Sequence, residues 1–177
     1  MSKTRKLIII SIFASLISIG AFIKVPVSLV PVTLQTFFIF LCGLTLNKYD
    51  SMKAVILYIT IGLIGFPIFA SGGGLSYILV PSFGYLIGFI PMCYVISYIK
   101  RDDRLSKKIM ISSLALGILY LIGIIYFIVI QYTQVGKIYE FSWLFYYLFI
   151  VYLPGDIISI VIALYLNKRI DLNRLYF

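Results

Sequence analysis

The chain has 177 residues, of which 62% are hydrophobic and only 12% are charged. Soluble domains carry about 25% charged residues, so this composition excludes a soluble domain and predicts a protein that crosses the membrane several times. The formal net charge of +9 does not indicate nucleic-acid binding, because the basic residues lie in short tracts between apolar segments and not on a face interleaved with aromatic residues.

Six apolar segments predict an all-α fold with six transmembrane helices in a single domain, residues 1–177. The hydrocarbon core that they must cross is about 30 Å thick. A cleavable signal peptide is the alternative for the first segment, but that segment is long enough to span and further membrane segments follow it. The expected spans are 7–23, 34–46, 52–65, 83–99, 109–131 and 143–166.

Four small side chains lie at helical spacing on one face of the first predicted span: Ser11, Ala14, Ser15 and Ser18. Small residues four positions apart let two helices approach closely. The stripe therefore predicts either packing against another helix of the same chain or docking onto a separate membrane protein.

The connection 24–33 contains Pro26 and Pro31, which exclude a regular helix, so we expect a loop or a partly re-entrant segment there. Thr33 and Gln35 stand where this connection enters the second span. Thr33 either caps that helix or faces a pocket, whereas Gln35 offers a ligand both a donor and an acceptor.

The uncharged connection 66–81 is rich in glycine and proline. Its three consecutive glycines form either a flexible loop or a backbone that approaches a ligand, and the flanking prolines and apolar residues favour a shaped lid between two spans. Tyr85 follows the connection and is expected to wall a pocket for a ring system. The candidate ligand-contacting residues of the loop are Ser71, Gly72, Gly73 and Gly74.

Asp156 is the one acidic residue inside a predicted span. An ionised aspartate at the centre of a membrane helix costs at least about 2.5–3.5 kcal/mol, so such a residue normally faces a cavity or a partner. Three roles fit it: a hydrogen-bonded structural group, a proton-coupling carboxylate or a ligand acceptor. Pro154 and Gly155 are expected to open a notch beside the carboxylate, which favours the ligand acceptor.

Lysine and arginine residues set the expected orientation. With the N-terminus inside, six spans place both termini and every lysine and arginine except Lys24 and Lys137 in the cytoplasm, as the positive-inside rule requires. We therefore expect a multi-pass protein of the cell membrane, with both termini cytoplasmic. The glycine- and proline-rich connections then lie outside and form a pocket that opens outward.

Missing residue types narrow the chemistry. The chain has no histidine, which excludes Ser-His and Cys-His relays, and no P-loop signature, which excludes ATP hydrolysis of that type. Cys42 and Cys93 fall within predicted spans without metal-ligand spacing, so we expect them in the core. The sequence predicts no enzyme activity, no metal and no cofactor.

Four strings stand at or between the predicted spans. They are GAFIKVPVSLVPVTLQTFFIFLCGLTL (20–46), GLIGFPIFASGGG (62–74), PSFGYLIGFI (81–90) and LPGD (153–156). In this order they resemble the BioY family, the biotin-binding S components of energy-coupling factor (ECF) transporters. The resemblance covers most of the chain.

This resemblance implies a six-helix S component that captures biotin from outside. Its partners would be a transmembrane coupling subunit, onto which the small-residue stripe docks, and two ATPase subunits. Biotin presents two ureido N–H donors, an apolar bicycle and a carboxylate. Asp156 is then expected to accept both N–H groups, while the glycine loop and Tyr85 close over the bicycle.

Two positions depart from the family pattern. Ser159 stands where a lysine suited to the biotin carboxylate is usual, and Phe83 replaces a glycine. Lys24 is the candidate replacement for the missing lysine. The departures leave open a different vitamin or an uncharged biotin-related ligand. A small intramembrane enzyme or assembly protein without transport is the alternative from another class.

Overall fold

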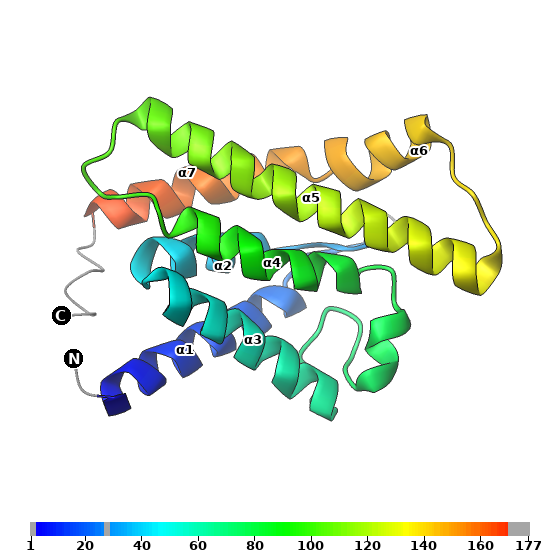
Figure 1. Cartoon of the computed structure of the whole chain (residues 1–177), viewed down its shortest axis with the longest axis horizontal. Coiled ribbons are helices and arrows are strands. Elements are labelled where there is room, and N and C mark those ends of the chain that lie inside the picture. Colours follow the sequence, from blue (N-terminus) through cyan, green and yellow to red (C-terminus); the bar gives the residue numbers. More distant parts are fainter. Residues whose placement is uncertain (1–2, 27–28, 170–177) are drawn as a thin grey trace.

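The computed structural model describes residues 3–26 and 29–169 and consists mainly of helices (Figure 1). A two-residue antiparallel hairpin, β1 with β2, and a 3-10 helix, η1, occupy the connections between them. The elements are α1 (Lys3–Phe22), β1 (Lys24–Val25), β2 (Val32–Thr33), α2 (Gln35–Thr45), α3 (Lys48–Ile64), η1 (Leu75–Leu79), α4 (Phe83–Ile96), α5 (Leu105–Val135), α6 (Phe141–Phe145), the π-helical turn η2 (Tyr146–Ile150) and α7 (Leu153–Arg169).

Every segment predicted to span contains helix, and the prediction of a mainly helical membrane protein is confirmed. Within the described ranges, α1, α5 and the stretch Phe141–Arg169 are long and apolar enough to cross a membrane. Two apolar helices, α2 and α4, are shorter. With 11 residues, α2 is about 17 Å long and does not cross the hydrocarbon core by itself.

Helix ends differ from the prediction where polar residues continue a helix. The α3 helix starts at Lys48, not at residue 52, because the Asn47 side chain accepts hydrogen bonds from the N–H groups of Tyr49 and Asp50 and caps it. The 31 residues of α5 extend beyond the apolar segment 109–131 at both ends.

The connection 24–33 is more regular than the predicted loop. Lys24 pairs with Thr33 and Val25 with Val32 in an antiparallel register. The fold is therefore not purely helical: this hairpin satisfies backbone groups that proline-containing sequence cannot place in a helix.

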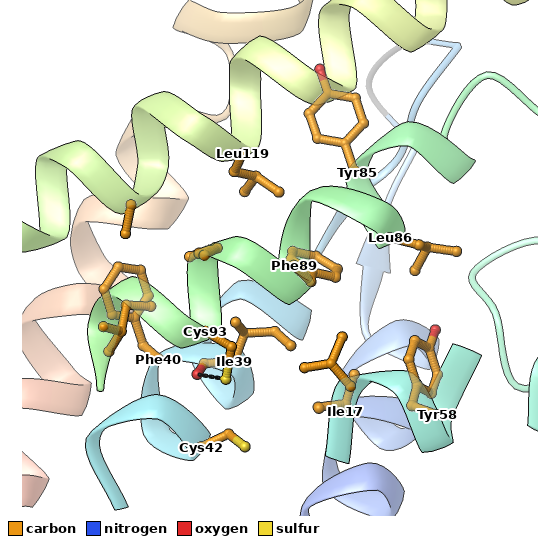
Figure 2. Packing of buried hydrophobic residues seen from close by; sticks show 14 of the residues in the cluster. Ile17, Ile39, Phe40, Cys42, Tyr58, Tyr85, Leu86, Phe89, Cys93 and Leu119 are labelled. Atoms are coloured by element: carbon orange, nitrogen blue, oxygen red, sulfur yellow. Dashed lines mark hydrogen bonds between the residues drawn. The ribbon is translucent and has the colours of Figure 1, made fainter. Parts of the chain in front are cut away.

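Large apolar side chains on the outer faces of the helices remain exposed, as a surface that meets lipid requires. They recur on α1, α5 and α7, and examples are Leu7, Ile12, Leu114, Leu121, Ile157, Ile158 and Val161. The interior is packed by a single apolar cluster, part of which Figure 2 shows. Cys42 and Cys93 are buried in it with free thiols, as predicted for the core.

Close approach of α4 and α5 depends on glycine. A Cβ at Gly84 would lie 2.3 Å from the Cβ of Tyr126, and one at Gly123 would lie 2.7 Å from the ring of Tyr85. Two helices that meet at such positions pack with their backbones near each other. The contact fixes Tyr85 between α4 and α5.

The two ends of the molecule differ in charge. The start of α1, the end of α7 and the connection 97–104 lie at one end (Figure 1). The Asp103 carboxylate of that connection accepts hydrogen bonds from Lys107 in the first turn of α5 and from the N–H of Lys100, which lower its pKa below the usual value. The hairpin, the connection between α3 and α4 and the connection between α5 and α6 lie toward the other end.

Candidate ligand-binding site

A cavity lies between the hairpin, the first turns of α2 and α4, the middle of α5 and the start of α7. The space that admits the centre of a water-sized sphere is about 40 Å³, within about 530 Å³ of non-atomic space that includes the open mouth. Most of the wall is apolar or aromatic with a few polar groups, which is the usual composition of a small-molecule site. The lining residues are Val30, Pro31, Val32, Thr33, Gln35, Thr36, Ala70, Tyr77, Ser82, Tyr85, Leu86, Phe89, Leu119, Tyr120, Tyr152 and Asp156.

Asp156 is the charged residue of this lining and is only 6% exposed. The Tyr120 hydroxyl donates a hydrogen bond to one of its carboxylate oxygens, and Thr36 lines the same cavity. Pro154 is the second residue of α7, which places Asp156 in the first turn of that helix. The N–H of Asp156 donates to the carbonyl of Tyr152 at 3.0 Å, so the backbone here continues from the preceding turn and the sequence Pro-Gly-Asp positions the carboxylate sterically.

Tyrosine rings form one wall of the cavity. Tyr85 and Tyr152 stack with their ring centroids 6.0 Å apart and an interplanar angle of 18°. The Tyr85 hydroxyl donates to the carbonyl of Leu148 at 3.1 Å, and the Tyr152 hydroxyl donates to the carbonyl of Val30. These bonds hold the rings in place, so that their faces and edges present a fixed apolar surface.

Thr33 and Gln35 line the cavity and belong to one hydrogen-bonded chain. The Thr33 hydroxyl donates to the Gln35 side-chain oxygen at 3.0 Å, and the Gln35 side-chain nitrogen donates to the Tyr58 hydroxyl at 2.7 Å. The cap position of α2 is Leu34, whose side chain makes no capping bond. These hydrogen bonds therefore connect the hairpin to α2 and α3 and orient the Gln35 amide.

The glycine loop, Ser71 to Gly74, supports the cavity without being part of its lining. Ala70, which precedes the loop, lines the cavity, and Phe69 behind it packs on Tyr58 and Tyr77. The N–H of Gly72 donates to Phe69, and that of Gly74 donates to Gly62. The predicted loop residues outside the lining are Ser71, Gly72, Gly73 and Gly74.

Ser159 and Lys24 also lie outside the lining, for different reasons. Ser159 is buried on α7, and its hydroxyl donates to the carbonyl of Gly155 at 2.8 Å. Lys24 is exposed on β1, and its ammonium group donates to the carbonyl of Ala70. Lys24 thus contacts the rim of the cavity, whereas Ser159 makes its hydrogen bond within its own helix.

Tyr120 and Tyr152 line the cavity but are not among the residues predicted from the sequence. Tyr152 had a usable signal, because residues four apart share a helix face and Tyr152 precedes Asp156 by four. Tyr120 is the lone phenol in the aliphatic run LALGILYLIGII, residues 114–125. A polar group in such a run marks an inward-facing position, and the structure places it against Asp156.

The small-residue stripe of α1 is divided between two environments. Ala14 is buried, Ser18 is half-buried, and Ser11 and Ser15 are exposed. The three hydroxyls donate to carbonyls four residues earlier, which leaves them little polarity to present to lipid. Ser11 and Ser15 lie in a shallow apolar groove with Thr4, Leu7, Ile8, Ile12 and Leu16.

The fold is shared with a solved structure, the S-component for biotin from an ECF-type ABC transporter. The TM-score is 0.78 over 96% of this chain and 93% of that chain, at 21% sequence identity. The solved chain therefore shows the same arrangement of helices.

Sequence relatives are closer. A probable biotin transporter BioY from Lysinibacillus sphaericus is 43% identical over 135 residues, 76% of this chain and 67% of the relative. The biotin transporter BioY from Thermotoga maritima is 40% identical over 122 residues, 68% of this chain and 72% of the relative. The model of the BioY family matches residues 1–174. The chain belongs to the BioY family.

Proposed function

We propose that this chain captures biotin and supports its uptake as the substrate-binding subunit of an ATP-driven ECF transporter. The observation that carries the proposal is the buried Asp156 carboxylate, set among aromatic rings in a cavity of a BioY-family chain. Relatives named as biotin transporters and a structural neighbour that is a biotin S-component support the same ligand.

The cavity offers a complementary group for each part of the biotin bicycle. Tyr120 uses one carboxylate oxygen of Asp156 as its acceptor, and an ionised carboxylate has further lone pairs for the two ureido N–H donors. Tyr85 and Tyr152 supply an aromatic wall for the apolar bicycle. The hydrogen-bonded side chains of Thr33 and Gln35 would make the polar contacts to the ureido carbonyl.

The glycine loop would lie at the mouth of the cavity. Closure over the bicycle would come through Ala70 and the glycine loop behind it, Ser71 to Gly74. Ser159 donates its hydrogen bond to Gly155 and would not touch the ligand.

Charge distribution supports an outward-facing cavity. Most lysines and arginines lie at the end of the molecule that holds the start of α1 and the end of α7, and the positive-inside rule favours the cytoplasmic side for that end. The cavity is lined by residues from the hairpin and from the connection between α3 and α4, which lie toward the opposite end. Biotin would therefore enter from outside a cell membrane.

Energy must come from other subunits. The sequence holds no P-loop signature, so ATP hydrolysis of that type belongs to partners. The proposed assembly contains a transmembrane coupling subunit and two ATPase subunits, with residues 1–177 as one S-component domain that carries out no chemical step. The exposed part of the α1 stripe, Ser11 and Ser15, is the proposed docking face, with Ala14 and Ser18 packing inside the chain.

Uptake of labelled biotin by cells that lack their own uptake and synthesis tests this proposal. With the coupling and ATPase subunits present, we expect Ser15→Trp to reduce uptake at least about tenfold, because an indole on the groove prevents close helix contact. Biotin binding to the purified variant should be unchanged, since Ser15 is remote from the cavity lining.

Ser113→Trp is the matched control, because Ser113 is an exposed serine on α5. Full uptake by this variant with loss in Ser15→Trp supports docking through α1. Equal uptake with and without the coupling subunits contradicts the S-component assignment and indicates a solitary facilitator. If binding occurs without uptake under any subunit combination, the chain is not a transport subunit.

A further inference from the structure

The lining of the cavity has an unbalanced charge for a ligand that is itself an anion. Asp156 contributes a carboxylate, and none of the described lining residues is a lysine or an arginine. Biotin carries a carboxylate of its own. Two carboxylates in an apolar space without a cation repel each other and lose hydration, so the ligand carboxylate must lie away from Asp156 and meet a cation elsewhere.

Lys24 lies at the rim of the cavity, where it can supply a cation for the ligand carboxylate. It pairs across the hairpin with Thr33, so the two side chains share one face of the hairpin, and Thr33 lines the cavity. The Lys24 ammonium donates to the carbonyl of Ala70, another lining residue. The side chain therefore bridges the hairpin and the glycine loop across the rim.

The Asp156 carboxylate and the Lys24 ammonium differ in exposure. Asp156 is 6% exposed and accepts a hydrogen bond from the Tyr120 hydroxyl. Lys24 is exposed on β1. An ammonium group has three N–H donors, so Lys24 can keep its bond to Ala70 and still donate to a carboxylate.

Lys137, the other lysine toward this end of the molecule, does not offer the same contact. Its ammonium lies 4.8 Å from the centre of the Tyr139 ring, in the connection that follows α5. Neither Lys137 nor Tyr139 is part of the cavity lining. Lys137 thus serves as a control that has the same charge and sits outside the site.

We infer that Lys24 recognises the ligand carboxylate at the mouth while Asp156 holds the ureido end inside, so that Lys24 determines the preference for an anionic ligand over its uncharged analogue. The inference rests on the proposed function, because it takes biotin as the ligand. Lys24 on the hairpin and Asp156 on α7 would together set the orientation of the ligand in the cavity.

Titration of the purified full-length chain with biotin and with biotin methyl ester tests this assignment. Both contain the same bicycle, and only biotin carries the negative charge. We expect Lys24→Met to weaken biotin binding roughly ten- to a hundredfold, the value of one charge-assisted hydrogen bond. Affinity for the ester should change less than about threefold, because the ester makes no ion pair with Lys24.

Lys24→Arg retains the charge and should keep the preference for biotin, and Lys137→Met should leave both affinities unchanged. An equal loss for biotin and ester in Lys24→Met would show that Lys24 acts only through its bond to Ala70 and would overturn the inference. Unchanged affinity of Lys24→Met for both compounds would also overturn the inference. If the wild-type chain binds neither compound, the proposed function itself fails, a result distinct from the loss of selectivity alone.

Discussion

Asp156→Asn is expected to weaken biotin binding by at least about a hundredfold, or roughly 3 kcal/mol. The carboxylate accepts charge-assisted hydrogen bonds, which contribute about 1.5–3 kcal/mol each. Asparagine removes the charge and turns an N–H₂ donor toward a ligand group that also donates. Binding isotherms of the purified variant with biotin measure the effect.

The fold should survive this substitution, which makes the result interpretable. Asparagine has the shape of aspartate, and its side-chain oxygen can still accept the bond from the Tyr120 hydroxyl. Ser159→Ala is the matched control, a buried polar residue of the same helix that lies outside the cavity lining. It should bind biotin within about threefold of wild type. Wild-type affinity in Asp156→Asn would remove Asp156 from the site.

Gly62→Ala is expected to destabilise the protein by about 1–3 kcal/mol, the usual cost of an overpacked core position. A Cβ at Gly62 would lie 2.1 Å from the Phe69 ring. That ring is 1% exposed and packs between Tyr58 and Tyr77, at centroid distances of 5.4 and 4.5 Å. It has no free space to enter, so the glycine loop must move with it.

Thermal unfolding in detergent measures this loss, and biotin affinity should fall in parallel because Tyr77 lines the cavity. Gly117→Ala is the matched control, also within a helix, where a Cβ would meet nothing within 4 Å. Since alanine favours helix over glycine by about 1 kcal/mol, that variant should be as stable as wild type or more so. Equal stability of the two variants would contradict the described packing of Phe69.

Apolar length predicted the positions of the long helices but not their ends, and it did not predict the 3-10 helix η1. Hydropathy does not register the Asn47 cap that starts α3, nor the polar turns that extend α5 past residue 131. The segment 143–166 is a continuous apolar run in sequence, yet it contains α6, a π-helical turn and α7. Pro154 signalled that irregularity, because proline cannot donate the bond that would continue the helix from the preceding turn.

Site residues could be predicted where a polar side chain stands within an apolar run or beside a proline-containing loop. Asp156 in an apolar run, and Thr33 and Gln35 after a proline-containing loop, could be singled out without a structure, and all three line the cavity. Tyr120 comes from a helix distant in sequence, and a single sequence does not reveal that pairing.

The glycine loop illustrates what the sequence leaves open. Its backbone was expected to face a ligand, but Gly73 approaches the carbonyl of Phe66 so closely that a Cβ there would lie 2.1 Å from the oxygen. Glycine marks close approach in both cases. Only the fold shows that the neighbour is the chain itself, so contact of the loop with biotin stays a proposal.

Calorimetric titration of biotin into the purified wild-type chain is the direct test of biotin capture by this chain. We expect a saturable heat signal with one biotin bound per chain in the absence of any other subunit, because the described cavity is formed within this chain. A folded sample that gives no saturable signal with biotin would contradict biotin capture.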